Sequence, residues 1–458
     1  MSEICGNRTK SLRGYVGSFV SWKGGELMEP IVLREAGVEP WVREDLGAWL
    51  DRGLSSLDRL CAGRVPDADM LGWRDWPVTY DRDELVRMQT AAEKVQDDTT
   101  MLVNIGIGGS YLGARAGLEL LLPPFHQEDS LRVYWAGHHL SGGYLVDLMN
   151  QLDQGEVSLH VVSKSGTTTE PGLAFRILRG YMEKRYGTKE AAERIYVTTD
   201  PASGALRTMA DDAGYRRFTI PPTIGGRYSV LTPCGLFPMA ACGIPVESIL
   251  AGAQTGRQRY LKLNPQNPAV RYAVIRQYLY QAGKKIEAFI HWDTRLEYLG
   301  RWFQQLFAES EGKEGKGLFP VTMQYSTDLH SMGQYMQEGE RHVFETVLWA
   351  TDPGCDLTVP RDIGDLDGLN YLAGKAFDGI NHEAARGTRT AHMAGGVPVL
   401  GIEVADLTPA SVGEMFYFFM VACAVSAVMM GVNPFDQPGV EAYKREMFRR
   451  LGKPGFES

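Results

Sequence analysis

The sequence predicts an α/β protein of two domains in series, each a mainly parallel sheet with helices on both faces. Short apolar runs alternate with amphipathic stretches along most of the chain, which is typical of strand–helix–strand units. This rhythm occurs twice, with an interruption near residues 240–265. The 458 residues also exceed the usual size of one domain, so more than one hydrophobic core is expected.

The first set of elements begins near Asp81. Residues 81–95 have the apolar spacing of an amphipathic helix. The run Met101–Ile107 then ends at a glycine cluster and passes into a helical pattern, so a strand, a turn and a helix are expected. The same order recurs, with further strand-like runs at 131–137, 157–163 and 194–199.

The segment Gly225–Pro238 breaks this rhythm, and a second set of elements follows it. Helical patterns cover 246–260, 267–283, 294–310 and 439–451, and strand-like runs cover 285–292, 342–350 and 397–404. We therefore divide the chain into an N-terminal segment (1–70), a first domain (71–245), a connecting helix (246–265), a second domain (266–435) and a C-terminal helix (436–458).

Composition indicates a soluble, cytoplasmic protein. Hydrophobic residues make up 44% and charged residues 22%, and the net charge of −9 with no long basic run argues against a nucleic-acid partner. Six scattered cysteines form no C-x-x-C pair, and the N-terminus lacks the apolar core of a signal peptide. The uncharged run Met415–Met430 nearly reaches membrane-spanning length, but it stands alone and ends in a polar turn. We expect a buried core helix there and no membrane partner.

Two loops have the composition of anion sites. Gly108, Gly109 and Ser110 follow the first strand, where glycine leaves backbone N–H groups open at a helix start, although a tight turn without ligand fits equally well. The second loop follows the strand-like run 157–163 and combines hydroxyls with a lysine. A phosphate cradle is the favoured interpretation, and a solvated Ser/Thr cap is the alternative. Its candidate residues are Ser163, Lys164, Ser165, Thr167 and Thr168.

Four further segments carry residues suited to chemistry. Two glycines precede Arg227, which suits a guanidinium aimed at a ligand or a structural ion pair. Glu309 lies where a helical pattern ends in an acidic, glycine-rich turn, a pattern that also fits a solvated loop. His330 lies one turn into an expected capped helix, and Lys444 lies in the last helix. Taken singly, a lone histidine or lysine is most often structural or solvent-exposed.

Taken together and in this order, the segments resemble the glucose-6-phosphate isomerase (phosphoglucose isomerase) family, in particular its shorter bacterial form. The matching segments are GIGGSYLG, SKSGTT, GGRYSVLT, ESEGKEGKGLFP, STDLHSMGQY and NPFDQPGVEAYK, from about residue 100 to residue 444. GGRYS together with the Lys444 segment is specific to this family, whereas GIGGS and SKSGTT also fit other sugar-isomerase (SIS) domains. The resemblance implies two SIS domains.

The resemblance also implies the role of each matched residue. Glu309 would move the proton between C1 and C2, His330 would open the sugar ring, Lys444 would assist there, and Arg227 would face the enediolate. The two loops would bind the phosphate, and Gln305 and Gln437 would contact the sugar. Members are homodimers that share each active site, and the histidine matching His330 comes from the neighbouring subunit.

The implied chemistry is reversible aldose–ketose exchange through a cis-enediol, which needs one carboxylate base and no cofactor. No His/carboxylate spacing in the sequence demands a metal. Isomerases with a relaxed sugar range remain an alternative, as does a sugar-phosphate-sensing SIS module that binds ligand without catalysis. Such a module has no need for Glu309, His330 and Lys444 together, which favours the enzyme.

Overall fold

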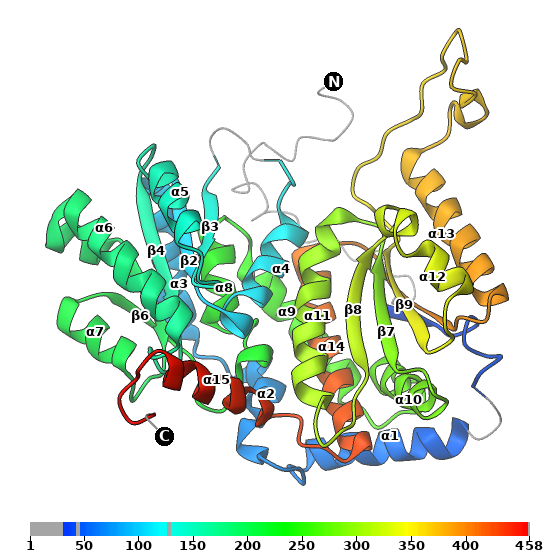
Figure 1. The fold of residues 1–458 in the computed structure, drawn as a ribbon, viewed down its shortest axis with the longest axis horizontal. Coiled ribbons are helices and arrows are strands. Elements are labelled where there is room, and N and C mark those ends of the chain that lie inside the picture. The colour runs from blue at the N-terminus through cyan, green and yellow to red at the C-terminus, as the bar shows by residue number, and fades with distance from the viewer. Residues whose placement is uncertain (1–30, 43–45, 126–129, 457–458) are drawn as a thin grey trace.

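The structure is a computed structural model that describes residues 31–42, 46–125 and 130–456. Within these ranges the chain forms two five-stranded sheets, with a shared layer of helices between them (Figure 1). The predicted α/β class is confirmed.

The first sheet is parallel throughout, in the order β3-β2-β4-β5-β6. Val103 and Ile105 pack with the helices of the outer face, whereas Leu102 between them packs into the inner core. The strands are β2 (Met101–Ile105), β3 (Arg132–Ala136), β4 (Val157–Val162), β5 (Ile195–Thr199) and β6 (Arg216–Thr219). The outer helices are α5 (Gly142–Leu152), α6 (Thr169–Glu193) and α7 (Ala205–Ala213), and the inner ones are α3 (Arg82–Asp98), α4 (Leu112–Leu121) and α8 (Pro233–Ala241).

The second sheet has the order β1-β10-β9-β7-β8 and is parallel except for β1. Its strands are β1 (Ile31–Arg34), β7 (Ile286–His291), β8 (Phe319–Gln324), β9 (Val343–Ala350) and β10 (Val399–Val404). Helices α10 (Pro268–Gln281), α11 (Glu297–Glu311) and α14 (Pro409–Met430) belong to the core between the sheets, whereas α12 (Gly333–Glu338) and α13 (Phe377–Ala394) pack on the other face. The remaining α-helices are α1 (Leu46–Cys61), α2 (Gly72–Thr79), α9 (Val246–Tyr260) and α15 (Gly439–Arg450).

Three strands were not predicted from the sequence. β6 reads RRFT and exposes its arginines, and β8 contains a proline, so neither has the apolar signature of a buried strand. β1 lies in the N-terminal segment, where it pairs antiparallel with β10. The second sheet thus includes residues from before the first sheet. The domain boundaries given above stay a prediction.

Helix α14 occupies the centre of the shared core. It is apolar on all sides, and the whole of its most hydrophobic 18-residue window is buried inside the protein. The prediction of a buried core helix is confirmed. The Thr408 hydroxyl accepts a hydrogen bond at its start, and Gly431 ends it in the left-handed conformation (φ 76°).

The strand order of the first sheet creates a binding edge. From β2 the chain moves to β3 on one side and then returns to β4 on the other side of β2. Ligands of open parallel sheets bind outside the carboxyl ends of the strands at such a reversal. The two predicted anion loops follow β2 and β4, so both lie at this reversal.

Helices α9 and α14 cross so closely that glycine is required at the contact. A Cβ added at Gly252 would lie 1.8 Å from the carbonyl oxygen of Ala410, and one at Gly413 would lie 1.9 Å from that of Ile249. We predict that Gly252→Ala lowers the midpoint of thermal unfolding, because overpacking costs about 1–3 kcal/mol. Gly180→Ala in α6, where nothing lies within 4 Å, should leave the midpoint unchanged or raise it. Equal midpoints for both variants would contradict this packing.

Candidate functional site

Arg227 joins the two halves of the protein. It lies in a 3₁₀ turn (Gly226–Tyr228) on the side of the first sheet, and only 3% of its side chain is exposed. Its Nε donates to the Ser310 hydroxyl at 2.9 Å, and its Nη1 lies 3.2 Å from a carboxylate oxygen of Glu309. Both acceptors belong to the last turn of α11. A buried guanidinium therefore holds a one-third exposed carboxylate at a helix end.

The same guanidinium binds the segment that precedes α15. Nη1 donates to the side-chain oxygen of Gln437 at 3.0 Å. Nη2 donates to the carbonyl oxygens of Pro434 at 2.6 Å and Asp436 at 3.0 Å. Arg227 thus places Gln437 next to Glu309, although the two residues are far apart in sequence.

The first glycine loop completes this cluster. Gln305 donates to Glu309 at 3.3 Å, and a Cβ added at Gly108 (φ 57°) would lie 2.9 Å from the Gln305 nitrogen. A Cβ at Gly109 would lie 2.0 Å from the carbonyl oxygen of Gly226. Any side chain at Gly109 would push this loop away from the turn that carries Arg227, so glycine is required here by close approach.

The Ser163–Thr168 loop is braced from within. The Ser163 hydroxyl accepts from the Gly166 N–H at 3.0 Å, and the Ser165 hydroxyl accepts from the Thr167 N–H at 3.2 Å. Thr168 makes no capping hydrogen bond with its side chain at the start of α6. The first N–H groups of a helix lack intrahelical partners, so this start is suited to binding an anion. Lys164 is exposed, and its ammonium donates to the carbonyl oxygen of Pro222 at 2.9 Å.

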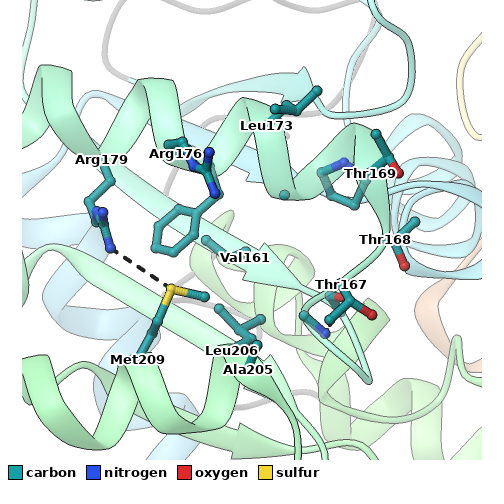
Figure 2. Close-up of a pocket in the computed structure, with 15 residues that line it drawn as sticks. Val161, Thr167, Thr168, Thr169, Leu173, Arg176, Arg179, Ala205, Leu206 and Met209 are labelled. Carbon is teal, nitrogen blue, oxygen red and sulfur yellow. Dashed lines mark hydrogen bonds between the residues drawn. The ribbon is translucent and has the colours of Figure 1, made fainter. Parts of the chain in front are cut away.

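A cavity of about 400 Å³ lies behind this loop, between α6 and α7 (Figure 2). Its wall includes Ser163, Thr167 and Thr168, together with apolar residues and two arginines of α6. None of Arg227, Gln305 and Glu309 lines it. The cluster around Arg227 therefore lies in the contact between the two halves and not in this cavity.

His330 and Lys444 are not part of the cluster. Helix α11 runs antiparallel to β8, because Gln304 donates to the carbonyl oxygen of Pro320 and Gly300 packs against Thr322. Glu309 lies further along α11 than Gln304, and is therefore beyond the start of β8. His330, which is exposed, comes after the end of β8 in the chain. A six-residue strand spans about 20 Å, so Glu309 and His330 lie at opposite ends of β8 in this chain.

The segment containing His330 forms a 3₁₀ turn, Thr327–His330. Its first flanking residue, Ser326, makes no capping hydrogen bond with its side chain, so the capped helix expected from the sequence is wrong. Half-buried Lys444 lies on α15, most of whose residues are exposed, with Glu441 of the same helix 3.1 Å away. Among the residues described, no group of three or more His, Cys, Asp or Glu side chains is placed to hold a metal ion.

Comparison with known proteins identifies the family of this chain. A family model described as phosphoglucose isomerase matches residues 84–351. The chain is 51% identical over 396 residues to a glucose-6-phosphate isomerase of Alkaliphilus metalliredigens, covering 85% of this chain and 88% of the relative. It is 48% identical over 437 residues to one of Clostridium perfringens, covering 93% and 97%. The chain belongs to the phosphoglucose isomerase family.

Two solved structures share the fold of this phosphoglucose isomerase family member. A hypothetical protein of Thermus thermophilus superposes with a TM-score of 0.84 at 29% identity, over 92% of this chain and 99% of that one. A glucose-6-phosphate isomerase of Chlamydia trachomatis superposes with a TM-score of 0.80 at 20% identity, over 93% and 89%. The arrangement of the two sheets is therefore that of the family.

Two residues of the site were not singled out from the sequence. Fully buried Ser310 accepts from Arg227, and the Lys313 side chain is only 7% exposed. Lys313 donates to the carbonyl oxygen of Asn433 and pairs with Asp436 at 2.8 Å. Burial lowers the pKa of Lys313, and nearby Arg227 adds to this effect. Both residues lie in the ESEGK segment that carries Glu309. Their closeness to Glu309 in the sequence was the feature that could have identified them as part of the site.

Lys313 should hold the segment that contains Gln437 in place. We predict that Lys313→Gln increases amide hydrogen exchange across residues 433–437, because the ion pair with Asp436 is lost. Lys316→Gln is the matched control, since Lys316 is exposed and pairs only with neighbouring Glu314 among the contacts described. Mass spectrometry of exchanged peptides measures both. Unchanged exchange in Lys313→Gln would show that Arg227 alone fixes the segment.

Proposed function

We propose that this chain catalyses the reversible isomerisation of D-glucose 6-phosphate and D-fructose 6-phosphate, a step of glycolysis and gluconeogenesis. Its relatives at 48–51% identity are named glucose-6-phosphate isomerase. One observation carries the chemistry: the Glu309 carboxylate lies 3.2 Å from the buried Arg227 guanidinium at the end of a helix. A base and a fixed positive charge are thus presented together.

Glu309 is the proposed base that takes the proton from C2 and returns it to C1. A single carboxylate can serve both carbons, because they are adjacent in the cis-enediol intermediate. The intermediate carries negative charge on oxygen, and the Arg227 guanidinium beside the proposed base supplies a positive charge. Because Arg227 is fixed by its bonds to Ser310, Pro434 and Asp436, it stabilises that charge without rearrangement.

The two loops at the edge of the first sheet are the proposed phosphate site. Ser110 follows β2, and the braced segment from Ser163 to Thr168 follows the neighbouring strand β4. Phosphate binding there would fix the substrate at a point remote from the reacting carbons, which lowers the entropy cost of reaction. Gln305 and Gln437 flank Glu309 and are the proposed contacts to the sugar.

We propose a homodimer in which His330 of one chain completes the site of the other. Two observations support a second copy as the partner. His330 and Glu309 lie at opposite ends of β8. The segment 352–376 projects from the second sheet (Figure 1), and its Ile363 and Leu366 side chains are fully exposed. Apolar side chains presented in this way are typical of an interaction surface.

The histidine would protonate the ring oxygen and open the sugar before proton transfer, since histidine is a common general acid in enzymes. Lys444 is proposed to assist at the same end of the substrate. The proposed location is the cytoplasm, and the proposed reaction needs no cofactor.

Replacing the proposed base tests the reaction and its mechanism together. We expect Glu309→Gln to lower turnover of fructose 6-phosphate by at least about 100-fold, because an amide cannot accept the proton. A coupled assay of EDTA-treated protein measures glucose 6-phosphate formation. Glu314→Gln is the control, since Glu314 is an exposed carboxylate of the same segment. Full activity in Glu309→Gln would assign the base elsewhere.

Mixing inactive subunits tests the shared site. His330→Ala and Glu309→Gln homodimers should each be inactive, but half of a randomly reassociated 1:1 mixture is heterodimer with one intact site. Activity should therefore return to about one quarter of wild type. Size-exclusion chromatography confirms the dimer before and after mixing. A mixture that stays inactive although heterodimers form would place His330 and Glu309 in the same subunit's site.

A further inference from the structure

A wholly buried group of charges lies directly behind the last turn of α11. The side chains of Arg276, Glu287 and Glu311 are all 0% exposed. Nε of Arg276 donates to Glu287 at 2.7 Å, and its two terminal nitrogens donate to the two oxygens of Glu311 at 2.6 and 3.2 Å. Arg276 also donates to the Ser426 hydroxyl of α14 at 2.8 Å. One arginine therefore links helices α10, α11 and α14 with strand β7.

Stability alone does not account for such a group. Transfer of charges from water to a protein interior is costly, and well-packed apolar side chains of similar size often give equal or greater stability. Burial disfavours the Arg276 cation, but the attraction of Glu287 and Glu311 outweighs it, so the net direction of its pKa is upward. The group remains ionic. Its directional hydrogen bonds fix the relative positions of the linked helices and strand more narrowly than apolar contacts would.

Three consecutive residues of α11 are held by two arginines. Glu309 contacts Arg227 through Nη1, Ser310 contacts Arg227 through Nε, and Glu311 contacts Arg276 on the core side. Successive helical residues project about 100° apart, so these contacts hold the turn from separate directions. The helix can neither rotate nor slide without breaking the bidentate pair between Glu311 and Arg276. The contact on the core side of α11 thereby fixes the orientation of the Glu309 carboxylate.

We propose that Arg276 and Glu311 are positioning residues for the base Glu309. The inference rests on the proposed function, since it assigns them a role in proton transfer. Neither side chain is exposed, so neither contacts substrate. They act through the backbone of the last turn of α11. A displacement of about 1 Å in a reacting group costs up to about 100-fold in rate, which sets the size of effect expected.

Glu311→Asp is the decisive variant. It keeps the charge, so Arg276 stays paired and folding is retained, but the shorter side chain must draw the end of α11 toward Arg276 to keep the pair. We expect kcat to fall at least about 10-fold with KM nearly unchanged, because the phosphate site is untouched. The kinetic isotope effect with glucose 6-phosphate deuterated at C2 should rise, because proton abstraction becomes more rate-limiting. Glu311→Gln should act in the same direction.

A buried ion pair away from the site provides the matched control. Glu414 of α14 is 3% exposed and accepts from Arg259 at 2.9 Å and from the Tyr260 hydroxyl at 2.6 Å. Glu414→Gln should lower the thermal midpoint as Glu311→Gln does. It should leave kcat per folded molecule and the isotope effect unchanged.

The outcomes separate this proposal from the proposed function. If wild type is active and Glu309→Gln is not, but both Glu311 variants match wild type in kcat and isotope effect, the buried group is only structural and the positioning role is refuted. If wild type itself has no isomerase activity, the proposed function fails first. If Glu414→Gln loses kcat as Glu311→Gln does, the effect reflects general destabilisation, and the proposal is overturned.

Discussion

The multiple hydrogen bonds of Arg227 are the interaction on which the site depends. This side chain comes from the first-sheet half, yet its acceptors lie on α11 and on the segment before α15. A guanidinium presents five donors in a rigid plane, so satisfying them at once fixes three chain segments relative to each other. The Arg227 side chain is only 3% exposed, so no solvent molecule readily replaces a lost acceptor. The position of Glu309 is a consequence of this arrangement.

The two sheets contribute different parts of the candidate site. The first sheet reverses its strand order at β2, and the loop after β4 presents hydroxyls at the start of α6, where Thr168 makes no capping hydrogen bond with its side chain. The second sheet contributes the carboxyl end of α11, where a carboxylate can project without entering the core. The shared core around α14 keeps these parts in register, because its helices cross at glycine contacts that leave no room for displacement.

The charges around α11 form two layers with different exposure. Glu309 is one-third exposed and faces the site, whereas Glu311 two residues later is wholly buried. A ligand can therefore reach the carboxylate of Glu309 but not that of Glu311. The opposite end of β8 carries His330 on an exposed turn, together with the projecting segment 352–376. The proposed base and the proposed ring-opening histidine thus lie at opposite ends of β8, which is why a second chain is proposed to complete the site.

The sequence by itself determined the alternation of strands and helices and the buried nature of α14. Both follow from local rules, because apolar periodicity acts over a few residues. The segments of the candidate site were indicated by the resemblance to the family. The sequence did not reveal β1, β6 or β8, whose short or polar strands depend on a neighbouring strand for their hydrogen bonds. It also gave no sign that Arg276, Glu287 and Glu311 are buried, since charged residues in a sequence pattern resemble a solvated face. Only the tertiary structure decided which charges meet in the interior, because that depends on contacts between residues far apart in the chain.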